Sequence, residues 1–206
     1  PMKEIINYYM PKIESSNIVE KLKLKKNDYF VVSSHREENV DSMENFNDLL
    51  ESLNEIANHY NKRIIFSTHP RTKKKLDSLS EIKMNEKIEI MKPMGLFDYI
   101  KLQIESYCVI SDSGTITEES SILQFPAITI RQSHERPEGM DEGVLIMSGL
   151  HKKNIIDSIK IVVEHQKSFG SKIVNDYDVN NFSEKVSKII FSYIDYINRT
   201  VWHKNN

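Results

Sequence analysis

The stretch YCVISDSGTITEESSIL, residues 107–123, contains the pattern that predicts the fold. Its first five residues, YCVIS, are mostly apolar and have the length of a buried strand. A polar turn with one glycine follows at residues 112–115, and residues 116–123 then have the character of a helix. A buried strand that leads through a short turn into a helix is typical of parallel sheets that are covered by helices on both faces.

Further apolar runs of strand length lie on both sides of this stretch. The six predicted strands span residues 29–34, 63–68, 87–91, 107–111, 127–131 and 144–148. The predicted helices among and after them span residues 43–60, 71–79, 96–104, 116–123, 152–165 and 182–197. In the longest early one, residues 43–60, apolar side chains recur with a 3.6-residue period. The sequence therefore predicts an α/β fold with a doubly wound, Rossmann-like parallel sheet.

The beginning of the chain has a different pattern. Residues 2–10 predict a weak helix that ends at Pro11, and residues 17–24 predict a second short helix with Ser16 as its N-cap. We therefore expect a connecting helical segment at residues 1–27 and a Rossmann-like domain at residues 28–206. The glycine fingerprint GxGxxG does not follow the first strand, so the sequence does not indicate a dinucleotide cofactor.

Composition excludes several classes of protein. The 28 Lys and Arg residues against 30 Asp and Glu residues argue against a nucleic-acid binder, which usually has a basic excess. No apolar run approaches the roughly 18 residues of a membrane span, and no signal peptide is evident, so we expect no membrane contact and a cytoplasmic location. The single cysteine, Cys108, excludes an internal disulfide and is predicted to be buried. No residues have the spacing of metal ligands, so we expect no metal.

Polar segments follow five of the predicted strands. They span residues 35–39, 69–71, 93–95, 112–115 and 132–143. The carboxyl ends of parallel strands lie along one edge of a sheet, which is where open α/β sheets usually bind ligands. The sequence therefore predicts a functional site at this edge.

The turn Ser113-Gly114-Thr115 leads directly into a predicted helix. Free backbone N–H groups and the helix dipole at such a place bind phosphate, and Gly114 would let the phosphate approach the backbone closely. The alternative is an ordinary helix cap, because Thr115 and Glu118 match a capping box. Glu119 lies one turn into the helix. Its carboxylate could accept hydrogen bonds from the hydroxyl groups of a ribose, or it could be a solvated surface carboxylate.

Three further side chains at this edge have two interpretations each. Arg136 could bind a diphosphate with its planar guanidinium, or could form a surface ion pair with Glu135 or Glu138. His35 could donate a proton to phosphate near neutral pH, or could be a structural histidine. The same two interpretations apply to His69.

Four motifs, taken in order, resemble those of the non-hydrolysing UDP-N-acetylglucosamine 2-epimerases. They are HREEN (residues 35–39), HP (residues 69–70), SDSGTITEE (residues 111–119) and HERPEGMDEG (residues 134–143). The resemblance runs from residue 29 to the end of the chain and, more faintly, through residues 2–26. It implies a GT-B fold that holds UDP between two Rossmann-like domains, of which this chain would be the C-terminal one. The implied partners are a UDP-sugar and either an N-terminal domain, which has no counterpart in these residues, or a homodimer partner.

The resemblance also implies roles for single residues. His35 matches the active-site histidine of the family, and Glu119 matches the carboxylate that holds the ribose. The residues that match the diphosphate site are Ser113, Gly114, Thr115 and Arg136, although Thr115 replaces the usual glycine. Met94 and Tyr99 fall where the family holds the uracil. Arg36 and His69 fall near a second, regulatory UDP-sugar site.

The reaction implied by this resemblance is elimination of UDP across C1 and C2, followed by re-addition with C2 inverted. It requires no metal or redox cofactor, and the isolated chain is expected to bind UDP with little or no activity. The segment RPEGMDEG is similar to the branch of the family that forms UDP-N-acetyl-L-fucosamine for capsule or O-antigen polysaccharides. Two alternatives stay open at this point: the donor-binding domain of a GT-B glycosyltransferase, and a non-catalytic nucleotide-sugar binding module.

Overall fold

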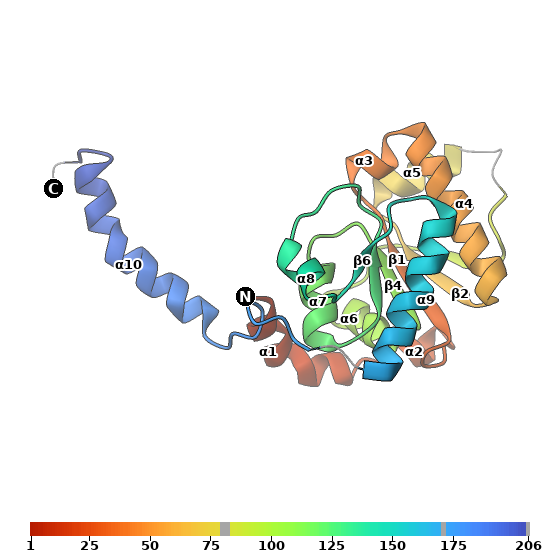
Figure 1. Ribbon diagram of the computed structural model, residues 1–206, viewed down its shortest axis with the longest axis horizontal. Coiled ribbons are helices and arrows are strands. Elements are labelled where there is room, and N and C mark those ends of the chain that lie inside the picture. The colour runs from red at the N-terminus through yellow and green to blue at the C-terminus, as the bar shows by residue number, and fades with distance from the viewer. Residues whose placement is uncertain (79–82, 170–171, 205–206) are drawn as a thin grey trace.

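A parallel six-stranded sheet lies at the centre of the computed structural model, which describes residues 1–78, 83–169 and 172–204 (Figure 1). The strands are β1 (Tyr29–Ser33), β2 (Arg63–Ser67), β3 (Ile88–Met91), β4 (Cys108–Ser111), β5 (Ala127–Thr129) and β6 (Ile146–Met147). Their order across the sheet is β3-β2-β1-β4-β5-β6, with every neighbouring pair parallel. The predicted doubly wound α/β sheet is therefore confirmed.

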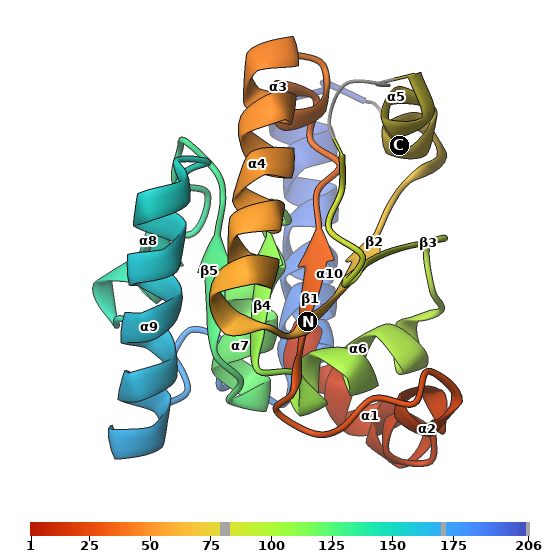
Figure 2. The same ribbon diagram turned by 90° about the vertical axis from the view of Figure 1, so that its right-hand side faces the viewer.

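Helices cover both faces of this sheet. The helices are α1 (Met2–Glu14), α2 (Ile18–Lys21), α3 (Glu37–Val40), α4 (Met43–Tyr60), α5 (Pro70–Ser78), α6 (Leu96–Glu105), α7 (Ile116–Leu123), α8 (Pro137–Asp141), α9 (Lys152–Phe169) and α10 (Phe182–Thr200). Figure 2 shows α4 and α9 on one side of the sheet and α6 and α7 on the other. This arrangement requires strands that are apolar on both faces, as the continuous apolar runs indicate.

Alternate residues of β1 contribute to two separate hydrophobic cores. Phe30 and Val32 pack with apolar side chains of α4 and α9, and Tyr29 and Val31 pack with those of α6 and α7. All four side chains are fully buried. The hydroxyl of Tyr29 donates a hydrogen bond to the carbonyl oxygen of Leu102 at 2.8 Å, which satisfies its only buried polar group.

The order of the strands reverses between β1 and β4, because β1 continues toward β2 and β3 while β4 continues toward β5 and β6. Loops that leave the two strands at such a point diverge to opposite faces and leave a crevice for ligands. The loop after β1 carries the HREEN motif, and the loop after β4 carries the SDSGT motif. The sheet therefore brings together two of the motifs that the sequence singles out.

The structure corrects several expected boundaries. Helix α1 does not end at Pro11 but continues to Glu14, because the fully buried Ile13 packs against Ile6 and Ile100 and so holds the last turn in place. Helix α2 is shorter than residues 17–24, and Asn17, not Ser16, is its N-cap. The hydroxyl of Ser16 donates to Asp98 at 2.5 Å.

Other differences concern the ends of elements. Strands β5 and β6 are shorter than predicted, and α9 and α10 are longer. The short helices α3 and α8 were not predicted, and residue 79 of the helix expected at 71–79 lies outside the described residues. Cys108 is buried in β4, as expected, and burial raises the pKa of its thiol. The division into a connecting segment and one domain stays a prediction.

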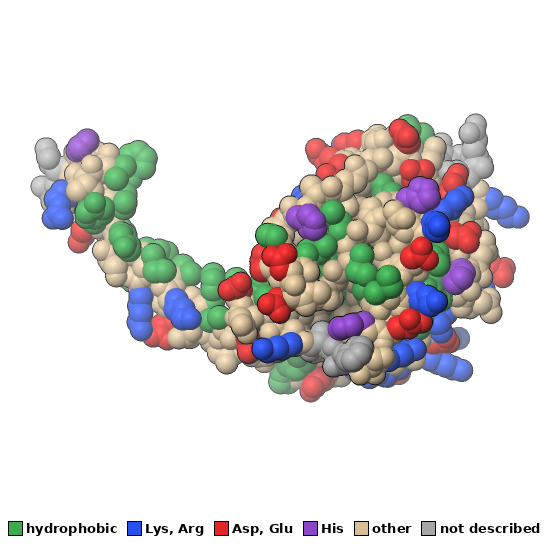
Figure 3. Space-filling view, viewed as in Figure 1, with side chains coloured by type: hydrophobic (Ala, Val, Ile, Leu, Met, Phe, Trp, Pro, Cys, Tyr) green, Lys and Arg blue, Asp and Glu red, His purple; other side chains and the backbone are tan. Residues whose placement is uncertain are grey.

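Helix α10 extends away from the rest of the molecule (Figure 1). None of its residues is buried, and its large apolar side chains lie in solvent, as the space-filling view shows (Figure 3). They include Ile189, Ile190, Phe191, Tyr193 and Ile194. Within residues 1–78, 83–169 and 172–204, the chain forms no helix that is both long and apolar enough to cross a membrane.

Candidate functional site

A buried carboxylate joins the loops that follow β1 and β4. Asp112, the first residue after β4, is fully buried. Its Oδ2 accepts hydrogen bonds from the hydroxyl of Ser34 at 2.8 Å, from the amides of His35 and Arg36 at 3.0 Å each, and from Nδ2 of Asn39 at 3.1 Å. Burial opposes ionisation of Asp112, but these hydrogen bonds and the His35 ring outweigh burial and hold its pKa below the usual value. Asp112 therefore fixes the HREEN loop against the SDSGT loop.

His35 lies at the predicted edge, with its Nδ1 at 3.1 Å from Oδ1 of Asp112. The side chain is 49% exposed, so the ring is held by the buried carboxylate on one side and open to solvent on the other. The hydrogen bond to Asp112 raises the pKa of His35 despite partial burial. His35 is thereby kept closer to the protonated form at neutral pH, which suits a group that donates to an anion.

The turn Ser113-Gly114-Thr115 ends where α7 begins. Thr115 is the N-cap, but in the described chain its side chain makes no capping hydrogen bond, so the expected alternative of a capping box with Glu118 is wrong. The hydroxyls of Ser113 and Thr115 lie 3.0 Å apart instead. The first N–H groups of α7 are thus left for an incoming anion, which the helix dipole also favours.

Arg136 lies directly over this turn. A methyl group at Gly114 would overlap the guanidinium of Arg136 and would come within 2.5 Å of a carboxylate oxygen of Glu135. Nε of Arg136 lies 2.9 Å from Oε1 of Glu118 on α7, and the guanidinium lies 3.8 Å from Glu135. The expected pairing with Glu135 is therefore present, but the nearer partner, Glu118, was not foreseen.

Glu119 faces away from solvent on the same helix. It is half-buried, and its Oε2 accepts a hydrogen bond from Nε2 of the buried Gln103 at 2.8 Å. Burial raises the pKa of Glu119, and the hydrogen bonds from Gln103 and Thr115 partly offset this effect. The alternative of a solvated surface carboxylate is therefore wrong.

The residues expected near a uracil, Met94 and Tyr99, lie on the same side of the sheet as α7. Met94 and Tyr99 both pack against the core on the α6 and α7 side of the sheet. Burial, and after it the charge of Glu119, raises the pKa of the Tyr99 phenol. The structure thus brings Tyr99 near Glu119, and the uracil role of Met94 and Tyr99 stays a prediction.

The two residues expected at a regulatory site follow the neighbouring strands β1 and β2 but have different partners. Arg36 points toward Glu135, with its NH2 atom 2.6 Å from Oε2, and its Nε donates to the carbonyl oxygen of Asp112 at 3.2 Å. His69 is exposed at the end of β2, where its Nδ1 accepts from the amide of Arg71 at 3.5 Å. Arg36 therefore belongs to the group around Gly114.

The sequence alone did not indicate four residues of this region, which are Asp112, Gln103, Arg131 and Glu135, the last as a partner of several arginines beside Gly114. Asp112 could have been found, because an acidic residue that directly follows a buried strand must find hydrogen-bond donors nearby. The other three are recognisable only from the contacts that they make across the sequence. The described residues hold no group of three or more His, Cys, Asp or Glu side chains arranged for a metal.

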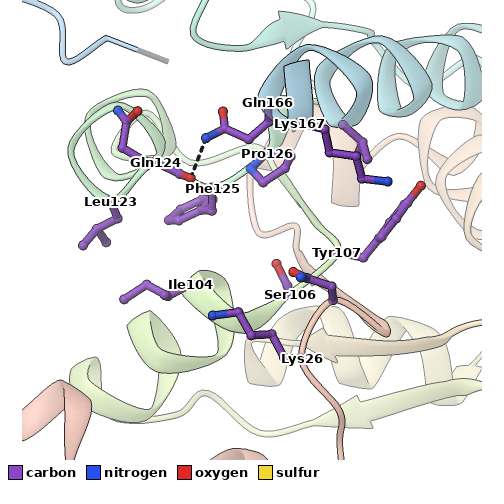
Figure 4. A pocket seen from close by; sticks show the side chains of 12 residues that line it. Lys26, Ile104, Ser106, Tyr107, Leu123, Gln124, Phe125, Pro126, Gln166 and Lys167 are labelled. Carbon is purple, nitrogen blue, oxygen red and sulfur yellow. Dashed lines mark hydrogen bonds between the residues drawn. The ribbon is translucent and has the colours of Figure 1, made fainter. Parts of the chain in front are cut away.

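A separate cavity of about 580 Å³ opens at the opposite edge of the sheet, before β4 and β5 (Figure 4). Its lining comes from the ends of α6, α7 and α9 and includes Tyr107, Phe125 and Gln166. None of the predicted site residues is among the residues that line it. The polar groups described above all lie at the other edge, so we place the candidate site there.

Comparison with known proteins identifies the family. A family model described as UDP-N-acetylglucosamine 2-epimerase matches residues 1–191. The UDP-N-acetylglucosamine 2-epimerase of Methanocaldococcus jannaschii is 37% identical over 151 residues, which are 72% of this chain and 41% of that protein. An epimerase of the same name from Methanococcus maripaludis is 33% identical over 82% of this chain and 46% of its own length.

Solved structures agree with the sequence matches. The UDP-N-acetylglucosamine 2-epimerase from Rickettsia bellii superposes with a TM-score of 0.87 at 45% identity, over 98% of this chain and 54% of that one. The M. jannaschii enzyme in complex with UDP-GlcNAc and UDP gives a TM-score of 0.79 at 30% identity, over 92% and 52%. The chain thus spans about half the length of the relatives that it matches. It belongs to the UDP-N-acetylglucosamine 2-epimerase family.

Proposed function

We propose that this chain is the UDP-binding half of an enzyme that inverts C2 of a UDP-N-acetylhexosamine. The observation that carries the proposal is the grouping of Gly114, Arg136, His35 and Glu119 at one edge of the sheet in a member of this family. The M. jannaschii relative has been crystallised with UDP-GlcNAc and UDP, which supports a UDP-sugar as the ligand.

The arrangement suits departure of a diphosphate. In the proposed reaction a base removes the C2 proton while the bond from C1 to the UDP oxygen breaks, and UDP takes the electron pair. The N–H groups at the start of α7 and the Arg136 guanidinium would stabilise the charge that develops on the phosphate oxygens. His35, whose pKa is raised by its hydrogen bond to Asp112, would donate to the same oxygens. Re-addition of UDP and return of a proton to the opposite face of C2 complete the inversion.

The sugar side of the site requires residues from elsewhere. The chain spans about half the length of its relatives, and we expect the carboxylates that act at C2 to lie on the other half. The apolar face of α10, with Phe191 80% exposed, is a surface of the kind that a further domain covers. We therefore assign the second wall of the site, and the cover of α10, to an N-terminal half supplied on the same chain or as a separate one.

The choice of sugar also belongs to this proposal. The segment RPEGMDEG, which forms α8 and the residues after it, favours a 6-deoxy UDP-N-acetylhexosamine, and so a role in capsule or O-antigen synthesis. The free, buried thiol of Cys108 is consistent with the cytoplasmic location expected from the sequence. Both stay predictions, as does the regulatory role expected for Arg36 and His69.

The test has two steps. Titration of the chain with UDP, followed by amide NMR, should shift the signals of Gly114, Thr115 and Glu119, and shifts confined to the cavity of Figure 4 would contradict the proposal. UDP-N-acetylglucosamine and its 6-deoxy relatives are then incubated in deuterated water, with and without an N-terminal half from a relative. Deuterium should enter C2 only when both halves are present.

The same experiment separates the alternatives. Family membership favours the epimerase over a GT-B glycosyltransferase, which would transfer the sugar to an acceptor and leave C2 unlabelled. A non-catalytic module would bind UDP and exchange no C2 proton even with the N-terminal half added. Full turnover by this chain alone would show that its own residues carry the C2 chemistry.

A further inference from the structure

Three arginines converge on one carboxylate beside the glycine turn. Glu135 forms ion pairs with Arg131, with Arg36 at 2.6 Å and with Arg136 at 3.8 Å. The arginines come from three separate places, namely the loop after β1, the end of β5 and the start of α8. Such a convergence of guanidiniums is what proteins use to hold phosphate groups.

The carboxylate of Glu135 lies where the phosphate site is expected. It comes within 2.5 Å of the position that a methyl group on Gly114 would take, at the start of α7. The cavity that remains between α7, β5 and this loop measures about 20 Å³, which is little more than one water molecule needs. A diphosphate cannot enter this space unless the Glu135 side chain leaves it.

The charges and the burial of the arginines also indicate a site for an anion. Arg131 is 8% exposed, and among the described residues its Nε has no hydrogen-bond acceptor, with a carboxylate oxygen of Glu38 at 3.9 Å. The three arginines are balanced by Glu38, Glu118 and Glu135, so removal of Glu135 leaves one positive charge in excess. That excess, together with the unpaired Nε atom, is suited to an incoming anion.

We propose that Glu135 is an internal substitute for the diphosphate, and that UDP displaces it to bind Arg36 and Arg131 in addition to Arg136. Glu135 is able to leave, because its side chain is 40% exposed and it lies in an exposed stretch at residues 132–135. The proposal rests on the proposed function for the identity of the nucleotide, but its anion site does not depend on the uridine. Glu135 thus competes with the ligand and weakens its binding.

The test is the affinity of Glu135→Gln for UDP, for inorganic pyrophosphate and for uridine, measured by calorimetry. We expect both UDP and pyrophosphate to bind at least about fivefold more tightly than to the unmodified chain, and uridine to bind equally. Glu138→Gln is the matched control, because it removes the same charge three residues away, at the start of α8, while its oxygen can still accept the hydrogen bond from Tyr177. In the Glu135→Gln background, Arg36→Gln and Arg131→Lys should each weaken pyrophosphate binding.

Two results would overturn the inference. Unchanged affinity in Glu135→Gln would show that the carboxylate does not compete, and weaker affinity would show that it scaffolds the arginines for the ligand. Tighter pyrophosphate binding by Glu135→Gln, in a chain that does not bind UDP with or without the substitution, would support the internal anion and instead refute the proposed function. The two proposals therefore fail in distinguishable ways.

Discussion

Replacement of Asp112 by asparagine tests whether this carboxylate holds both the loop and the charge of His35. Oδ2 of Asp112 accepts four hydrogen bonds, whereas Oδ1 faces the His35 ring and accepts only a longer bond from the His35 amide, at 3.2 Å. Asparagine keeps only one acceptor oxygen. We expect this oxygen to take the position of Oδ2, because the four hydrogen-bond donors meet there. The new NH2 group then faces Nδ1 of His35, where it can donate only to a neutral imidazole.

The expected loss of stability in Asp112→Asn follows from the burial of Asp112. Removal of one partner from a buried ion pair costs about 3–5 kcal/mol, because the other charge is left uncompensated. His35 is half exposed and can release its proton to solvent, so we expect a smaller loss of about 2–3 kcal/mol in the free energy of unfolding. For a chain of this size that loss lowers Tm by about 4–12 °C. The pKa of His35 should fall, because Asp112 is the main cause of its elevation.

The pH dependence of this loss has a defined shape. The lowered pKa of Asp112 adds stability above its ordinary value near 3.8, and this stability is lost as the pH falls through the folded pKa. The raised pKa of His35 adds stability below its ordinary value near 6.5, and this stability is lost as the pH rises through the folded pKa. The difference in the free energy of unfolding between the unmodified chain and Asp112→Asn should therefore be largest between about pH 4 and pH 6.5.

The assay is urea unfolding followed by circular dichroism, since the single tryptophan, Trp202, is exposed beyond α10 and does not report on the core. The titration of His35 is followed by NMR of its ring protons. Asp48→Asn, the same change at an exposed position of α4, is the control and should alter stability by less than about 0.5 kcal/mol. A difference that does not vary with pH, or an unchanged His35 pKa, would refute the coupling.

Four further changes test the site and its surroundings. Gly114→Ala should weaken UDP binding roughly tenfold in calorimetry, equivalent to about 1.4 kcal/mol, with little effect on urea unfolding, because the added methyl group meets the movable ends of side chains. Arg136→Ala should weaken UDP binding by about 1.5–3 kcal/mol, and an unchanged affinity would reduce Arg136 to an ordinary ion pair. Glu119→Gln should weaken binding of UDP but not of pyrophosphate, whereas equal losses would indicate damage to the start of α7. Phe191→Ser should lower epimerase activity reconstituted with an N-terminal half and leave UDP binding by this chain intact, so an unaltered activity would exclude α10 from that contact.

The sheet could be predicted from the sequence because its signal is local. Strands β1, β4 and β5 are apolar runs that are buried along most of their length, and strands that are buried on both faces need no information about their neighbours to be recognised. The errors arose where packing overrides local preference. Pro11 is accommodated inside α1 because Ile13, two residues later, is buried against Ile100 of another helix.

The common location of the candidate residues could be predicted from the sequence, but their pairings could not. The rule that parallel strands end at one edge was enough to bring His35, Ser113 and Arg136 to the same place. The contact between Arg36 and Glu135 joins residues 99 positions apart, and it depends on which loops become neighbours when the sheet order reverses. No spacing in the sequence encodes such a pair.

In the proposed two-half enzyme, the position of Asp112 bears on what the second half would contribute to UDP binding. Asp112 alone bonds to Ser34, His35, Arg36 and Asn39, so residues of this chain hold the HREEN loop in place, and the proposed leaving-group side would be ordered before any other domain arrives. Preorganised dipoles contribute most where water is excluded, and in the proposed half-site each contact with the diphosphate would be screened by solvent. The second half would therefore supply more than the groups that act at C2. By closing over the same diphosphate it would lower the local dielectric constant and strengthen the contacts of Arg136 and His35, so UDP should bind more tightly to the two halves together than to this chain alone.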